Sequence, residues 1–229
     1  MSPLEAVVFD VDDTLYLERH YVRSGLAAVD RWLAEHLGRA GFFDRAWEAF
    51  DRGVRGNLFD RVLAGWNLPV SAEALARLVQ QLVTIYRTHD PAIALAPDAE
   101  ACLARLHPGF RLAAVSDGPL PSQQAKVRRL GLDRWMEPIV LTASLGPGFA
   151  KPSTEPFRAV ERFLGVSGER CVYVADNPAK DFHGPQALGW QTVRIRRPLG
   201  LHAAADCPLR LDMAAEDLGP LAAWLEERS

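Results

Sequence analysis

A short apolar strand that ends in carboxylates constrains this chain more than any other feature. Residues Ala6 to Phe9 are apolar and include two valines, which is typical of a central strand covered on both faces of a parallel sheet. Asp10, Asp12 and Asp13 follow directly. Like charges at the end of a buried strand repel one another unless a cation lies between them. We therefore interpret Asp10 and Asp12 as part of a metal and acid/base site.

The same carboxylates have a simpler interpretation, as caps of the next helix or as residues of a solvated turn. An Asp-x-Asp pattern alone does not distinguish a metal and acid/base site from a cap or turn, so the rest of the chain must decide between these interpretations. Oxygen ligands suit a hard cation, and Mg²⁺ is the first choice because it accepts one or two carboxylates together with phosphate oxygens of a substrate. The pattern thus indicates phosphoryl chemistry.

The composition describes a globular protein with small-molecule partners. The 229 residues are 48% hydrophobic and 24% charged, which excludes a disordered or fibrous chain. This length fits one large domain or a core with a smaller second domain. The formal net charge is -3 and the sequence has no block of Lys or Arg, so we expect neither a nucleic-acid nor a membrane partner. The oligomeric state stays open.

The cysteines and the N-terminal residues indicate which structural sites and which cellular compartment to expect. Cys102, Cys171 and Cys207 are far apart and form no Cys-x-x-Cys pattern, so neither a zinc site nor a disulfide framework is expected. Few residues precede the first strand and Glu5 is among them, so we expect no signal peptide. The chain also has no uncharged apolar run of membrane-spanning length. The expected compartment is the cytoplasm.

Residues 17–94 have a helical pattern throughout. Apolar side chains recur every three or four residues in four stripes, which predicts four helices without a strand between them, a small bundle. The stripes are Val22 to Leu37, Phe43 to Val54, Leu58 to Trp66 and Leu75 to Tyr86, the last following Ser71. We interpret these side chains as the core of the bundle and its arginines as a solvated face.

From Pro91 onward, strands and helices are expected to alternate, which predicts a parallel sheet with helices on both faces. Strands are predicted at residues 110–115, 139–142, 171–175, 192–195 and 209–211. Helices are predicted from Pro97, at 122–130, 154–164 and 179–188, and at 214–227. The chain then divides into an α/β core, residues 1–16 and 95–229, and an inserted helical cap, residues 17–94.

Polar residues follow several of these strands, at the sheet edge where active sites of open α/β folds lie. Ser116 comes after the second strand, Lys151 lies in the loop after the third, and Asp176 follows the fourth. Asn177 and Pro178 then predict a helix start at the site. Asp181, one turn later, either faces the same site or is a favourable charge in the first turn of that helix.

The loop before Lys151 contains Gly146 and Gly148, but Lys151 is followed by Pro and the glycine spacing is wrong for a Walker motif. Beside a carboxylate cluster, Lys151 is suited to neutralise a phosphoryl group. Ser116 offers a hydroxyl, and Asp117 and Gly118 offer backbone N–H groups in a tight turn that could hold phosphate oxygens.

These residues carry a family resemblance. Asp10-Val-Asp-Asp-Thr14-Leu, Ser116-Asp-Gly, Lys151-Pro and Asp176-Asn-Pro-Ala-Lys-Asp181 resemble, in order, the four motifs of the haloacid dehalogenase superfamily of hydrolases. The match spans Val7 to roughly Arg196. The resemblance implies a Rossmann-like, doubly wound parallel sheet, a helical cap inserted after the first motif, and Mg²⁺-dependent phosphoryl transfer through an aspartyl-phosphate.

The resemblance also implies roles for individual residues. Asp10 resembles the nucleophile and Asp12 the general acid/base, while Ser116 and Lys151 hold the phosphoryl group. Asp176 resembles the metal ligand that completes a site with the Asp10 carboxylate and the Asp12 main-chain carbonyl. Thr14 and Asp181 are secondary site residues. Asp117 stands where asparagine is common, and we expect its carboxylate to point away from the phosphate or to be hydrogen-bonded.

The leading interpretation is a phosphatase for a small phosphorylated metabolite, and a phosphomutase would share every motif. The dehalogenases of the superfamily resemble one another in lacking the second carboxylate, so Asp12 argues against that chemistry. A phosphonate hydrolase would need a lysine from the cap, and residues 17–94 contain none. Outside the enzymes, a phosphate-accepting receiver module and a non-catalytic binding protein of the same fold remain as alternatives.

Overall fold

The structure, a computed structural model, describes residues 3–66 and 68–229 and divides into two compact units. A core unit comprises Met1–Arg19 and Ile93–Ser229, and a helical unit comprises His20–Ala92. Residues 1, 2 and 67, which fall in the predicted core and cap ranges, lie outside the described residues.

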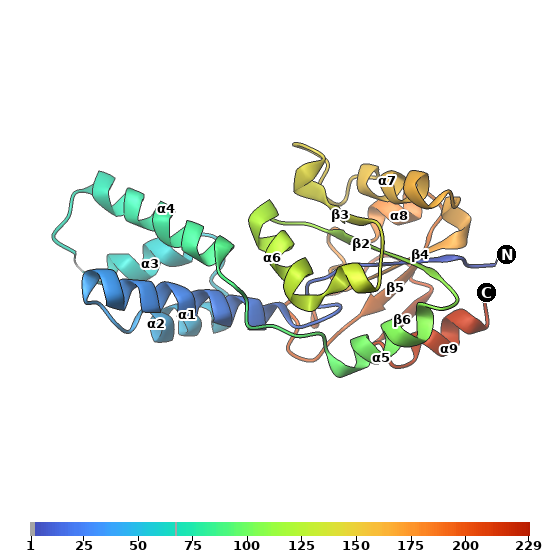
Figure 1. The fold of residues 1–229 in the computed structure, drawn as a ribbon, viewed down its shortest axis with the longest axis horizontal. Helices are drawn as coiled ribbons and strands as arrows, with labels where there is room; N and C mark the ends of the chain where they lie inside the picture. The colour runs from blue at the N-terminus through green and yellow to red at the C-terminus, as the bar shows by residue number, and fades with distance from the viewer. Residues whose placement is uncertain (1–2, 67) are drawn as a thin grey trace. The chain divides into compact units, whose positions relative to one another are not determined.

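The core unit is built on a parallel sheet flanked by helices (Figure 1), as the alternation of strands and helices predicts. In the described residues the sheet has six strands in the order β3-β2-β1-β4-β5-β6. The strands are β1 (Ala6–Phe9), β2 (Arg111–Ser116), β3 (Ile139–Leu141), β4 (Cys171–Ala175), β5 (Gln191–Ile195) and β6 (Met213–Ala215). The helices are α5 (Pro97–Leu106), α6 (Leu120–Leu130), α7 (Glu155–Leu164), α8 (His183–Ala187) and α9 (Leu221–Glu226). Short 3₁₀ turns lie at Leu132–Arg134, Thr142–Ser144 and Gly168–Arg170.

Strand β1 is the centre of the sheet and fixes where its polar edge lies. Phe9 is paired with Ala114 of β2 on one side and with Val174 of β4 on the other. All four residues of β1 are buried, as their apolar character predicts. Because the three strands are parallel and nearly in register, the residues that follow them emerge at one edge.

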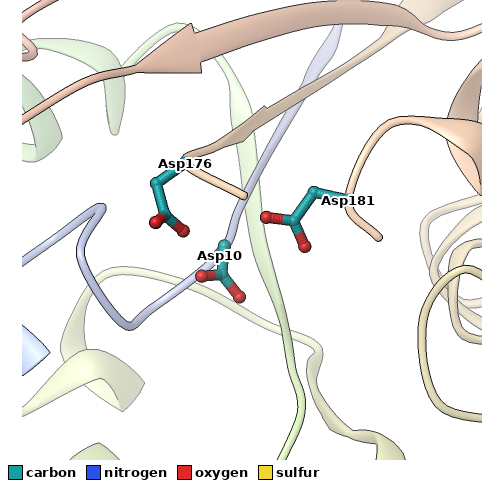
Figure 2. Close-up of side chains that lie close together, drawn as sticks. All are labelled: Asp10, Asp176 and Asp181. Carbon is teal, nitrogen blue, oxygen red and sulfur yellow. The ribbon is translucent and has the colours of Figure 1, made fainter. Parts of the chain in front are cut away.

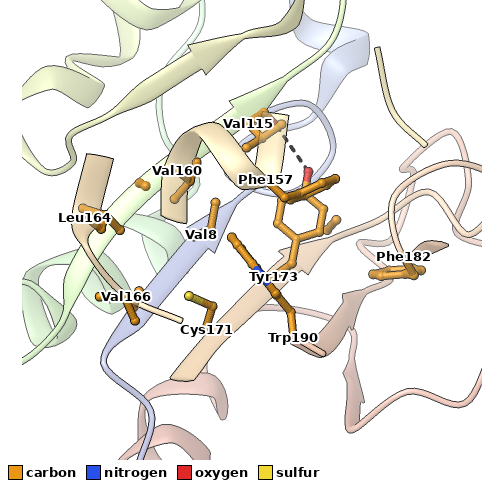
Figure 3. Close-up of a cluster of buried hydrophobic side chains, with 13 residues drawn as sticks. Val8, Val115, Phe157, Val160, Leu164, Val166, Cys171, Tyr173, Phe182 and Trp190 are labelled. Carbon is orange, nitrogen blue, oxygen red and sulfur yellow. Dashed lines mark hydrogen bonds between the residues drawn. The ribbon is translucent and has the colours of Figure 1, made fainter. Parts of the chain in front are cut away.

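A cluster of buried hydrophobic side chains lies between α7 and the sheet (Figure 3). The Phe157 ring meets the Tyr173 ring of β4 edge-on at a centroid distance of 4.9 Å, and the Trp190 ring at 5.5 Å. The Tyr173 hydroxyl donates a hydrogen bond to the Val115 carbonyl, 3.2 Å away. A buried aromatic side chain of the core therefore ends in a polar group directed toward β2, which is separated from β4 by β1.

The helix predicted after β4 begins later than the sequence indicates. Residues 178–182 form turns, and α8 starts only at His183, so the predicted helix start at Asn177 and Pro178 is wrong. Side chains close the turn instead: Asp181 Oδ2 accepts from the Asn177 N–H at 2.9 Å, and Asn177 Oδ1 accepts from the Ala179 N–H at 3.0 Å. Such local bonds compete with helix formation.

The C-terminal region also differs from the prediction. Residues 209–211 form no strand; β6 lies at Met213–Ala215, and the last helix starts at Leu221 rather than at residue 214. The alternating Leu209 and Leu211 belong to a loop whose apolar side chains pack against the hydrophobic cluster. The alternation of Leu209 and Leu211 correctly indicated side chains that pack inward, but it wrongly predicted that their segment is a strand.

The helical unit contains α1 (Glu18–Leu37) from His20 onward, α2 (Phe42–Asp51), α3 (Leu58–Ala64) and α4 (Ala72–Thr88), as the four stripes predict (Figure 1). Its core includes Leu26, Phe42 and Leu82, each fully buried. Asp30 of α1 accepts from the Phe42 N–H at 2.7 Å and thereby caps α2. Ser71 caps α4 by accepting from the Ala74 N–H at 3.2 Å.

Candidate active site

Three buried carboxylates from two neighbouring strand ends face one another in the core unit (Figure 2). Asp10 follows β1, Asp176 follows β4, and Asp181 comes from the turn after β4. One oxygen of each lies within 4.8 Å of the others, and Asp181 is fully buried. The convergence predicted for Asp10 and Asp176 is therefore present, and Asp181 lies in the site.

Lys151 neutralises part of this negative charge. Its Nζ lies 2.6 Å from Asp10 Oδ1 and 2.8 Å from Asp181 Oδ1, and it donates to the Tyr173 hydroxyl at 3.0 Å. Only 5% of Lys151 is exposed. Burial would lower the pKa of the ammonium, but the carboxylates of Asp10 and Asp181 outweigh it and raise the pKa well above its usual value. The lysine is therefore a fixed positive charge.

Lys151 pairs with two of the three carboxylates and does not balance their charge, and the pKa values of Asp10 and Asp176 show the excess of negative charge. Burial, opposed by Lys151 and assisted by Asp181, raises the pKa of Asp10 to about 7. Burial together with the charges of Asp10 and Asp181 raises the pKa of Asp176 to about 10. Asp176 Oδ2 is buried and has no hydrogen-bond partner among the described residues. An all-oxygen donor set with an unpartnered oxygen and excess negative charge fits a hard divalent cation.

Asp12 lies apart from this cluster and is held by donors of its own. Lys126 Nζ lies 2.7 Å from both carboxylate oxygens of Asp12, and Gln123 Nε2 donates to Oδ2 at 3.1 Å. The Tyr16 hydroxyl donates to Oδ1. Burial alone would raise the pKa of Asp12, but the charge and hydrogen bonds of Lys126, Tyr16 and Gln123 lower it. Asp12 is therefore ionised at rest.

The turn after β2 is fixed by side-chain hydrogen bonds. The Ser116 hydroxyl donates to Gln123 Oε1 at 3.0 Å. The Asp117 carboxylate accepts from the Thr142 hydroxyl at 2.7 Å and from the Lys151 N–H at 3.2 Å, and it pairs with Lys180 at 3.1 Å. Asp117 is thus hydrogen-bonded to the segments that carry Lys151 and Lys180, and its carboxylate holds these segments in place.

Thr14 is fully buried, and its hydroxyl has no hydrogen-bond partner among the described residues. Its carbonyl accepts from Arg197 Nε at 2.8 Å, and Arg197 in turn pairs with Asp98 at 2.7 Å. The structure therefore gives the Thr14 backbone a part in holding the segment after β1.

Four residues of the site were not anticipated from the sequence. Tyr173 lies inside β4 and carries no motif signal. Gln123 and Lys126 are three residues apart on α6, a spacing that places both side chains on one helix face directed at the site. Glu18 lies near Asp12, and burial and the Asp12 charge raise the pKa of Glu18 to about 7. Only the helix spacing of Gln123 and Lys126 could have been noticed beforehand.

The helical unit has a cavity of its own, about 450 Å³ in volume. It is lined by His20, Arg23, Ser24, Ala27, Phe43 and Ala92.

Among the helices of residues 3–66 and 68–229, none has the length and apolar character needed to span a membrane.

A parallel sheet with a buried acidic cluster, a buried lysine and a separately held aspartate at one edge defines an α/β enzyme site, and comparison with known proteins identifies the family. Residues 4–189 match the model of the haloacid dehalogenase-like hydrolases, described as a hydrolase family. The chain belongs to this family, which confirms the resemblance seen in its motifs and the expectation that it is a hydrolase.

Curated relatives and solved structures agree with this assignment. The chain is 32% identical over 205 residues to a protein of Methanopyrus kandleri named glyceraldehyde 3-phosphate phosphatase, covering 85% of this chain and 84% of the relative. A Methanocaldococcus jannaschii protein of the same name is 25% identical over 84% of this chain and 85% of the relative. The HAD-hydrolase YfnB of Bacillus subtilis has the same fold, with a TM-score of 0.70 at 22% identity over 98% of this chain and 99% of that one.

Proposed function

We propose that this protein is a Mg²⁺-dependent phosphatase that hydrolyses a small phosphorylated metabolite through an aspartyl-phosphate on Asp10. The observation that carries the proposal is that the carboxylates of Asp10 and Asp12 have different surroundings, each suited to a different role. Asp10 lies against Lys151 in a cluster that fits a cation, whereas Asp12, two residues on, has separate donors. A nucleophile needs charge neutralisation by its neighbours, and an acid/base needs to lie apart from that charge.

The reaction has two steps. In the first, an Asp10 oxygen forms a bond to phosphorus, the bond from phosphorus to the substrate oxygen breaks, and Asp12 delivers a proton to that oxygen. In the second, Asp12 takes a proton from a water that attacks the phosphoryl group, which releases inorganic phosphate and restores Asp10. Because Asp12 is ionised at rest, it has to receive the first proton from the substrate monoanion or from solvent.

The proposed magnesium site is formed by the carboxylates of Asp10 and Asp176 and the main-chain carbonyl of Asp12, with Asp181 beside it. A bound Mg²⁺ supplies neutralisation of the charge on the phosphoryl oxygens. Lys151 adds a second positive charge at the Asp10 side, and Ser116 with the N–H groups of the turn at Asp117 and Gly118 is proposed to hold the remaining phosphoryl oxygens.

The substrate proposal rests on the relatives. Five curated relatives are named glyceraldehyde 3-phosphate phosphatase, so this three-carbon aldehyde phosphate is the first compound to test. We also propose that the helical unit acts as a cap, because it is inserted in the chain at His20, shortly after the Asp10-to-Leu15 segment. A cytoplasmic location remains part of the proposal.

The test is phosphate release from glyceraldehyde 3-phosphate and a panel of sugar phosphates, nucleotides and small acid phosphates, with and without Mg²⁺. We expect release that depends on Mg²⁺ and is abolished by Asp10→Asn, which removes the nucleophile with almost no change in volume. Asp133→Asn, an exposed aspartate, is the matched control. Normal release by Asp10→Asn would refute the mechanism, and transfer of phosphate back to product would indicate a mutase.

A further inference from the structure

The face of α6 that carries Gln123 and Lys126 is a feature of the site to which the proposed mechanism gives no role. Both side chains are 3% exposed, although one is an amide and the other an ammonium. Burying a charge is costly unless it is paired and hydrogen-bonded. The partners of Lys126 and Gln123 therefore explain why these residues are buried.

Lys126 meets Asp12 symmetrically. Its Nζ lies 2.7 Å from Asp12 Oδ1 and 2.7 Å from Oδ2, so the ammonium holds both oxygens rather than one. The Tyr16 hydroxyl occupies the Oδ1 side as well, and the Gln123 amide occupies the Oδ2 side. With both oxygens engaged from three directions, the Asp12 carboxylate has one orientation.

Gln123 connects this carboxylate to the turn after β2. Its Oε1 accepts from the Ser116 hydroxyl at 3.0 Å, while its Nε2 donates to the Asp117 carbonyl at 2.7 Å and to Asp12 Oδ2 at 3.1 Å. Both partners of Nε2 are acceptors, which fixes the orientation of the amide. Glycine at residue 118 leaves room for the amide in this position: a Cβ there would lie 2.6 Å from Gln123 Nε2.

We propose that Gln123 and Lys126 are positioning residues that aim the Asp12 carboxylate at the leaving oxygen of the substrate and couple it to Ser116. This inference rests on the proposed phosphatase function. The two residues act on the chemistry only through Asp12, so their effect should appear wherever proton transfer by Asp12 limits the rate. A misplacement of about 1 Å at such a group costs on the order of 100-fold in rate.

The test compares two leaving groups. An alkyl phosphate such as glyceraldehyde 3-phosphate needs a proton on its leaving oxygen, whereas p-nitrophenyl phosphate has a stable leaving anion and needs it far less. We expect Lys126→Met to lower kcat/KM about 100-fold for the alkyl substrate and less than about 5-fold for the aryl one. Gln123→Met should show the same selectivity with a smaller loss. Lys126→Arg should restore most of the activity, because it keeps the positive charge.

The controls lie on the same helix. Gln124→Ala and Arg128→Met remove an exposed amide and an exposed cation from α6 and should leave both rates unchanged. In an Asp12→Ala background, Lys126→Met should cause no further selective loss, since two residues that act as a unit are not additive. Circular dichroism and thermal melting confirm that each variant is folded; if Lys126→Met is not, Gln123→Met and Lys126→Arg carry the comparison.

The outcomes separate this inference from the function on which it rests. Equal losses for both substrates in folded variants, or a full additional loss in the Asp12→Ala background, would overturn the positioning role while leaving the phosphatase intact. Failure of wild-type protein to release phosphate in an Asp10-dependent way would overturn the proposed function, and the positioning role with it.

Discussion

The Asp10, Asp176 and Asp181 cluster is short of positive charge, and this has a measurable consequence. The pKa of Asp10 is raised to about 7 and that of Asp176 to about 10, chiefly by burial. In the metal-free protein both carboxyl groups therefore hold protons in neutral solution for part or all of the time. A cation that binds there has to displace these protons.

We predict that Mg²⁺ binding releases protons and strengthens as the pH rises from about 6 to about 8. Titration calorimetry in two buffers of different ionisation enthalpy measures the number released. Asp176→Asn, which removes one of the protonated carboxyl groups, should bind Mg²⁺ weakly and release fewer protons. Affinity that is independent of pH, with no proton release, would show that the carboxylates are already ionised.

A second charged pair, away from the carboxylate cluster, stabilises the segment after β1. Arg197 is 7% exposed and bonds Asp98 at 3.0 and 2.7 Å, while the Leu218 N–H donates to Asp98 at 3.0 Å. Burial acts to raise the pKa of Asp98, but the hydrogen bonds from Arg197 and Leu218 outweigh it and lower the pKa below its usual value of 3.8. A lowered folded-state pKa gives stability that is present above the unfolded pKa and is lost as the pH falls through the folded one.

Asp98→Asn should therefore lower the free energy of unfolding at pH 7 by about 1–3 kcal/mol, with the difference from wild type shrinking below about pH 4. Urea unfolding at several pH values measures it. Asp133→Asn, at an exposed position, should change the free energy by less than about 0.5 kcal/mol throughout. A deficit that stays constant down to acid pH would show that the charge of Asp98 is not what stabilises the fold.

At the scale of elements, the helical unit depends on a close approach of α1 to α4. A Cβ on Gly25 of α1 would lie 2.5 Å from the Tyr86 ring of α4 and 3.1 Å from the His89 ring. The Tyr86 ring also meets Phe59 of α3 at a centroid distance of 5.7 Å. Glycine is thus needed at residue 25 for space rather than for backbone conformation.

We predict that Gly25→Ala destabilises the protein by about 1–3 kcal/mol, even though alanine favours a helix by about 1 kcal/mol over glycine, because overpacking dominates. Denaturant unfolding measures the change. The matched substitution Gly65→Ala places its Cβ 3.5 Å from the nearest atom, the Val62 carbonyl oxygen, and should be nearly neutral. Equal effects at both positions would mean that Tyr86 moves aside without cost.

The sequence predicted the elements whose signals are repeated along the chain. The apolar run of β1 and the stripes of α1 to α4 depend on many side chains, so the structure matches them within a few residues. The start of α8 depended on Asn177 and Pro178 alone, and the Asp181 side chain closes a turn there instead. A capping signal of two residues is easily overruled by one local hydrogen bond between a side chain and the backbone.

For the site, too, some features follow from patterns along the chain and others only from three-dimensional packing. That Asp10 and Asp176 meet follows from parallel topology, which fixes the edge at which strand ends emerge. The place of Lys126 beside Asp12 and of the Tyr173 hydroxyl beside Lys151 depends on how α6 and β4 present their side chains. Such contacts come from packing in three dimensions, and the sequence marks them only by the three-residue spacing of Gln123 and Lys126 on α6.

At the scale of the whole molecule, the chain combines an α/β core that holds every residue of the proposed chemistry with a helical unit inserted after β1. The carboxylate cluster, Lys151, Asp12 and the α6 face all belong to the core. The core alone therefore accounts for the proposed phosphoryl transfer. The choice of substrate is the proposed task of the helical unit.

In the proposed mechanism, Asp10 accepts the phosphoryl group. The most direct measurement is acid quenching of the protein during turnover of glyceraldehyde 3-phosphate or the best substrate of the panel with Mg²⁺, followed by borohydride reduction and peptide mass spectrometry. A phosphorylated aspartate is reduced to homoserine, and we predict this change at Asp10 in wild-type protein and its absence in Asp10→Asn. Phosphate release without any modification of Asp10 would contradict the account.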